Sequence, residues 1–168
     1  MSVLSEIKTI KAEIEKLRKE AKEKVEAIFK TAVLELFTEY PNLKRLSWTQ
    51  YTPYFNDGDP CTFRSSHDSP AIYFTSPAPY EEEVEDDDYD RYEEEWNTWS
   101  YYDWSKDYKT KTLKASLTED HLAQLKTGEA VQEFLHNFDD EDMENLFGDG
   151  YKVVITAKGI EVDDFDHD

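Results

Sequence analysis

The residues best suited to chemistry lie close together, at Asp57, Asp59, Cys61 and His67. A thiolate can act as a nucleophile when an imidazole accepts its proton, and two carboxyl groups can act as general acid and base. The two aspartates flank Gly58 in a turn, where their oxygens could also hold a hard cation such as Ca²⁺ or Mg²⁺. These residues define one hypothesis, a small metal-dependent or thiol enzyme.

The motifs that would strengthen this hypothesis are missing. The sequence has no P-loop, no Gly-rich dinucleotide fingerprint, no Gly-x-Ser-x-Gly, no metalloprotease His pair and no complete calcium-loop spacing. Asp-Gly turns are ordinary hairpin chemistry, and a cysteine at a strand end is commonly a small buried side chain. His67-Asp68 and the tail (Asp164, Asp166, His167, Asp168) could bind a transition metal, but we expect them to be solvated. We therefore expect no enzymatic activity, no cofactor and no metal site.

A second kind of chemistry comes from the acidic run between Glu81 and Trp96. Its 16 residues hold 11 carboxylates and one arginine, a net charge of 1 − 11 = −10, which is half of the −20 carried by the whole chain. Like charges at this density repel one another, so they require water or a cationic partner around them. The run is expected at the surface, where it could bind a basic protein.

Aromatic residues are interleaved with these carboxylates. Tyr89, Tyr92, Trp96 and Trp99 are spaced 3, 4 and 3, which would place them on one face of a helix, and Tyr101, Tyr102 and Trp104 continue the series. Aromatic side chains often dominate interfaces, while acidic neighbours steer a basic partner toward them. In the alternative, the tryptophans pack on the protein's own sheet and residues 81–95 form a mobile loop. The predicted partner-binding residues are Glu81, Glu82, Glu83, Glu85, Asp86, Asp87, Asp88, Tyr89, Asp90, Tyr92, Glu93, Glu94, Glu95, Trp96, Trp99 and Trp104.

Charge and composition also limit the partners and the location. A strongly negative field repels nucleic acid and anionic lipid, so we expect no direct binding to either. A row of carboxylates can, however, imitate DNA phosphates, and a DNA mimic is a sharper form of the partner-binding hypothesis. No apolar run is long enough to cross a bilayer, the N-terminus lacks the apolar stretch of a secretory signal, and the lone Cys61 fits a reducing compartment. We expect a cytoplasmic protein.

The first element that must position these residues is a long helix from Val3 to about Tyr40, which contains no Gly or Pro and stops at Pro41. The apolar residues of its first half follow the 4-3 rhythm of a coiled coil, at Val3, Ile7, Ile10, Ile14, Leu17 and Ala21. We expect this half to protrude and to associate with another copy of the chain through Ile7, Ile10, Ile14 and Leu17, rather than fold back over its own sheet. A wider stripe then predicts packing on a globular body, at Val25, Ile28, Phe29, Ala32, Val33, Leu36 and Phe37.

The rest of the chain predicts an α+β body with a small antiparallel or mixed sheet. Strand-like segments at residues 43–63 form a hairpin that includes Cys61 to Phe63, and residues 71–75 form another strand. A helix capped by Thr118 is interrupted at Gly128, and a short helix spans residues 139–147.

A terminal β-hairpin spans residues 153–162, followed by a solvated tail from Asp163. We expect residues 1–42 to form an oligomerisation or docking helix. Residues 43–168 then form the body, with an acidic insertion at 81–104.

The stretch from Ser47 to Phe63, Ser-Trp-Thr-Gln-Tyr-Thr-Pro-Tyr-Phe-Asn-Asp-Gly-Asp-Pro-Cys-Thr-Phe, resembles one found in small acidic proteins of bacteria and their viruses that have no assigned activity. The last ten residues, Gly159 to Asp168, also resemble the ends of such proteins. The resemblance implies a bacterial or phage source and transfers no catalytic or binding residue. The sequence thus favours a non-enzymatic, homo-oligomeric module that binds a basic partner protein. If the source is a phage, the natural form of this function is inhibition of a host nucleic-acid-handling or defence protein. The enzyme and an oligomeric structural scaffold remain alternatives.

Overall fold

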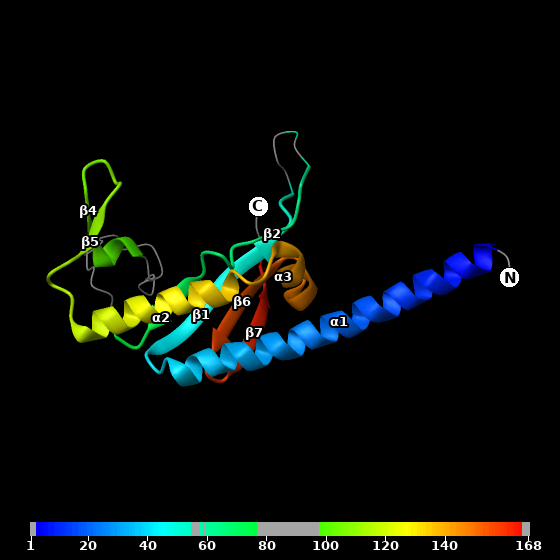
Figure 1. Ribbon diagram of the computed structural model, residues 1–168, viewed down its shortest axis with the longest axis horizontal. Coiled ribbons are helices and arrows are strands. Elements are labelled where there is room, and N and C mark those ends of the chain that lie inside the picture. The colour runs from blue at the N-terminus through cyan, green and yellow to red at the C-terminus, as the bar shows by residue number, and fades with distance from the viewer. Residues whose placement is uncertain (1–2, 55–57, 59, 77–97, 166–168) are drawn as a thin grey trace.

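A computed structural model describes residues 3–54, 58, 60–76 and 98–165 of the chain (Figure 1). It confirms the α+β class, with a long N-terminal helix, a small antiparallel sheet, C-terminal helices and a terminal pair of strands. Across these ranges, no helix combines the length and the apolar character needed to cross a bilayer.

Helix α1 (Val3–Glu39) dominates the shape of the molecule. Every residue from Ser5 to Lys24 is exposed, whereas Phe29, Val33 and Phe37 are buried on one face because they recur every four residues. At about 1.5 Å per residue, 37 residues span about 55 Å, which exceeds the width of a small domain. The N-terminal half of α1 therefore runs out beyond the body (Figure 1).

Strand β1 (Leu43–Tyr51) is the centre of a five-stranded sheet. On one side it pairs with β6 (Tyr151–Thr156), which pairs in turn with β7 (Gly159–Asp164). On the other side, two short strands share its edge: β3 (Ala71–Phe74) pairs with its first half and β2 (Arg64–Ser65) with its end. All of these pairs are antiparallel.

The expected hairpin after β1 is only partly correct. The strand that returns beside β1 comprises Arg64 and Ser65, and Cys61 to Phe63 lie outside it. The terminal hairpin is confirmed, but β7 continues through Asp163 and Asp164. Phe165 follows with its ring 5.6 Å from that of Tyr51, so the expected solvated tail does not begin at Asp163.

Helices α2 (Glu119–Leu135) and α3 (Asp140–Phe147) begin at capping boxes, with Thr118 and Asp139 as the N-caps. Helix α3 ends at Gly148, whose φ of 87° suits glycine. Helix α2 passes through Gly128 without a break, which corrects the expected interruption. Gly128 is buried, so tertiary packing offsets its low helix propensity, about 1 kcal/mol relative to alanine.

The core lies between one face of the sheet and the three helices. Phe29 of α1 is its aromatic centre, with ring centroids 5.6 Å from Phe134, 5.1 Å from Phe138 and 5.4 Å from Phe147. Phe147 also meets Trp48 of β1 edge-on at 5.8 Å. Aromatic contacts thus join the second half of α1 to α2 and α3, and Phe147 of α3 joins this cluster to the sheet.

Candidate interaction surfaces

The apolar seam of α1, defined here as Ile7, Ile10, Ile14 and Leu17, lies on the part of the helix that leaves the body. Its four side chains are between 45% and 59% exposed. Their 3-4 spacing places them in one row along the helix. A continuous row of large aliphatic side chains in water is typical of a surface that another protein covers.

Ile28 lies in line with this seam on the exposed face of α1, and not in the body-facing stripe in which the sequence placed it. It is 65% exposed, although its neighbour Phe29 is fully buried. Ile28 lies two heptads after Ile14, so it continues the coiled-coil rhythm past Ala21. The helix therefore has two separate apolar faces, one turned to the core and one to solvent.

The side of α1 next to the seam, which includes Arg18 and Ala21, faces acidic residues of the same chain across a groove. A groove of about 860 Å³ separates α1 from α3 and is lined by basic Arg18 and Lys22 on one wall and by Glu141 and Asp142 on the other. The two walls of the groove therefore carry charges of opposite sign. The seam residues Ile10, Ile14 and Leu17 do not line this groove.

Most of the predicted partner-binding residues, from Glu81 to Trp96, lie outside the described residues, but both flanks of that segment are placed. Gln124 of α2, 1% exposed, links the two flanks: its Nε2 donates to the carbonyl of Ser76 at 2.9 Å, and its Oε1 accepts from the hydroxyl of Tyr101 at 2.9 Å. One buried side chain therefore holds the base of the acidic segment on both sides. Nothing in the local sequence indicated this role for Gln124, because the contact joins residues far apart in the chain.

The aromatic residues at the end of the segment have different environments. Tyr101, at the end of the 3-10 helix η1 (Thr98–Tyr101), is fully buried, so it belongs to the core and not to a surface row of anchors. Trp104 lies in the small hairpin formed by β4 (Tyr102–Trp104) and β5 (Lys111–Leu113). The Lys111 ammonium lies 4.0 Å from the ring centroid of Tyr102 and 5.5 Å from that of Trp104, a cation–π arrangement.

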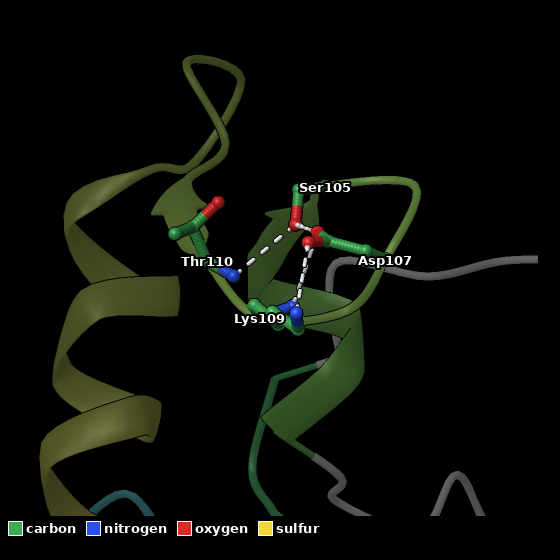
Figure 2. Close-up of polar contacts among 4 residues, drawn as sticks. All are labelled: Ser105, Asp107, Lys109 and Thr110. Carbon is green, nitrogen blue, oxygen red and sulfur yellow. Dashed lines mark hydrogen bonds and ion pairs between the residues drawn. The ribbon is translucent and has the colours of Figure 1, made fainter.

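The tip of this hairpin is organised by its own polar groups (Figure 2). The Ser105 hydroxyl donates to Asp107 Oδ1 at 2.6 Å and accepts from the Thr110 amide at 3.1 Å. The Asp107 carboxylate also accepts from the Lys109 amide at 3.4 Å. The Ser105 hydrogen bond, and then the Lys109 amide, lower the pKa of Asp107, so the charged form is favoured.

The residues of the enzyme hypothesis are not assembled into a site by the described part of the chain. Asp57 and Asp59 lie outside it, and Cys61 is exposed. His67 is 4% exposed, and its Nε2 lies 2.9 Å from the carbonyl of Phe138, an arrangement in which the ring donates to the backbone. A polar pocket of about 410 Å³ borders His67, but Cys61 does not line it, and no cluster of three metal-ligating side chains occurs in the described ranges.

We expect Gln124→Leu to lower the free energy of unfolding by about 1–3 kcal/mol, because a buried donor and a buried acceptor lose their Gln124 partner. Hydrogen exchange should rise around η1 and β4 more than in β6. The matched control is Gln132→Leu, the same change on the same helix at a half-buried position. Equal exchange changes in the two variants would contradict the role of Gln124 at the base of the segment.

No family model, no curated protein and no solved structure matches this chain.

Proposed function

We propose that this protein is a non-enzymatic interaction module that self-associates through α1 and binds a basic partner protein through residues 81–104. The observation that carries the proposal is the exposed seam on the free half of α1. A long amphipathic helix with a heptad row of isoleucine and leucine gains stability mainly by covering that row. A second copy of the chain supplies the same row, so self-association is the simplest way to cover it.

The acidic segment supplies the second surface. The net charge of −10 carried by residues 81–96 attracts a basic surface and accelerates encounter, and Tyr and Trp residues among the carboxylates can anchor the bound partner. Gln124 fixes both flanks of the segment to the body, which lowers the entropy lost when the segment binds.

Self-association would raise the strength with which the acidic segments bind a basic partner. Exposed ion pairs contribute little individually and are screened by salt, so one acidic segment binds modestly. Two segments on one assembly bind a partner with two basic sites, or a repetitive basic surface, with a much higher avidity. Self-association and acidic binding therefore act together in this proposal.

The test compares the intact protein with a variant whose 11 carboxylates in residues 81–95 are changed to Asn and Gln. Both are tagged, and the proteins they retain from a lysate are identified at low and at high salt. We expect a basic protein that binds the intact form at low salt, dissociates at high salt and binds the neutralised variant at least about tenfold more weakly. Binding should be measured again with the purified partner.

Two controls separate the alternatives. Glu161→Gln with Asp163→Asn removes exposed charge from β7 and should leave binding intact. Cys61→Ala should also have no effect, whereas an enzyme centred on this residue would lose activity. Equal retention by the neutralised variant would overturn the proposal, and competition by duplex DNA for the same partner would support its DNA-mimic form.

A further inference from the structure

We infer that two copies of α1 pair in parallel and in register, so that both bodies, with the described flanks of the acidic segment, lie at the same end of the assembly. This inference rests on the self-association part of the proposed function. It adds the orientation of the helices, which the charges beside the seam determine.

The heptad positions follow directly from the exposed row. Ile7, Ile14 and Ile28 occupy position a, and Ile10 and Leu17 occupy position d. Residues at the neighbouring positions e and g border the seam and meet the partner helix in a coiled coil. Their charges decide which orientation is stable.

The charges on the two borders are of opposite sign. The g positions hold Glu6, Glu13 and Glu20, and the e positions of the same stretch hold Lys11 and Arg18. All five side chains are exposed. Within the part of the chain that the structure describes, no ion pair engages Glu6, Lys11, Glu13 or Arg18.

In a parallel pair, each g residue faces the e residue five positions later on the other helix. Glu6 then faces Lys11 of the partner subunit, and Glu13 faces Arg18 of the partner subunit. Symmetry makes each contact twice, which gives four attractive pairs along the seam.

In an antiparallel pair, g faces g and e faces e. With the seams aligned, Glu6 faces Glu20 of the partner subunit, and Glu13 faces Glu13 of the partner subunit. Lys11 likewise faces its own copy. Like charges across an interface are unfavourable, so the border charges favour the parallel arrangement.

The core contacts of α1 do not use the side chains of the seam. Successive residues of a helix are about 100° apart, so exposed Ile28 and buried Phe29 point in different directions. The core contacts of α1, at Phe29, Val33 and Phe37, lie on a face separate from the seam. A second helix can lie along the seam without displacing the core.

Parallel pairing sets the geometry of binding. The β4–β5 hairpin, which adjoins the acidic segment, lies at the end of the molecule opposite the N-terminal tip of α1 (Figure 1). Parallel helices therefore bring both bodies, and both β4–β5 hairpins, to one end, where a single partner can meet them. Antiparallel helices would place the two bodies at opposite ends of the assembly.

Charge reversal tests the orientation. In a parallel pair, Glu13→Lys and Arg18→Glu each replace attraction with repulsion, so each should raise the dissociation constant of the assembly roughly tenfold. The double variant restores attraction and should return to within about threefold of the original constant. In an antiparallel pair, Glu13→Lys exchanges one like-charge contact for another. Neither a weakening by the single changes nor a rescue by the double variant is then expected. Sedimentation equilibrium measures the constants, and circular dichroism checks helicity.

Disulfide trapping provides an independent measurement. In a Cys61→Ser background, Ile7→Cys places the two thiols side by side only in a parallel pair, and oxidised glutathione should cross-link them. Ala12→Cys, at the outward position f, is the matched control and should not cross-link efficiently. If the protein assembles but shows neither rescue by the double variant nor an Ile7→Cys cross-link, the parallel pairing alone is overturned. If the wild-type protein stays monomeric, the proposed self-association is overturned as well.

Discussion

Ile14→Asp is expected to convert the assembly to monomers while the body stays folded. Ile14 is 45% exposed in the single chain, so the change removes little from the body, whose buried α1 residues begin further along the helix. In the proposed assembly the same position would be covered, and a carboxylate there would have to be desolvated without a partner. Because the change occurs in every copy, we expect the dissociation constant to rise by about 100-fold or more. Light scattering coupled to size exclusion gives the mass at several concentrations.

The matched control is Ala12→Asp, which adds the same charge to the same exposed stretch of α1 on the side opposite the seam. This variant should keep the mass of the wild type. Retention of the oligomer by Ile14→Asp would show that the seam is not the interface. Dissociation of the Ala12→Asp variant as well would show a general effect of charge on the helix and not one of the seam.

The sequence predicted well those features that depend on neighbours in the chain. The absence of Gly and Pro before Pro41 predicted α1, and the capping residue Thr118 predicted the start of α2. The short helix expected at residues 139–147 is α3, for which the structure shows Asp139 as the N-cap. The terminal hairpin followed from two apolar segments, at residues 153–156 and 160–162, on either side of a turn that ends at Gly159, whose φ is 145°. These signals are local, so no tertiary information was needed to read them.

Features that depend on distant contacts could not be read in this way. Ile28 and Phe29 are both large and apolar, and only the packing against the body shows that one is exposed and the other buried. Tyr101 looked like one more member of an aromatic surface row, but its hydroxyl meets Gln124 across 23 residues of chain. For the candidate surfaces, spacing therefore predicted the seam, whereas the way in which the acidic segment is held could not be predicted.

The largest change in stability is expected at Phe29, the buried neighbour of Ile28. Phe29→Ala should lower the free energy of unfolding by about 3–5 kcal/mol, a large part of the roughly 5–15 kcal/mol typical of a domain. The phenyl ring is fully buried and contacts three other aromatic rings, so its removal leaves a cavity where α1, α2 and α3 meet. Urea unfolding in the Ile14→Asp background measures this change without a contribution from assembly.

Ile28→Ala is the control for Phe29→Ala and should have the opposite pattern of effects. Since Ile28 is 65% exposed, its truncation should change the stability of the monomeric body by less than about 0.5 kcal/mol. In the otherwise wild-type chain it should weaken self-association, because it removes a side chain from the seam. A large loss of stability with Ile28→Ala, or a negligible one with Phe29→Ala, would contradict the assignment of the two faces. The expected pattern would mean that α1 packs on the body and joins the copies through different residues. Self-association can then be abolished by mutation while the fold that holds the acidic segment is kept.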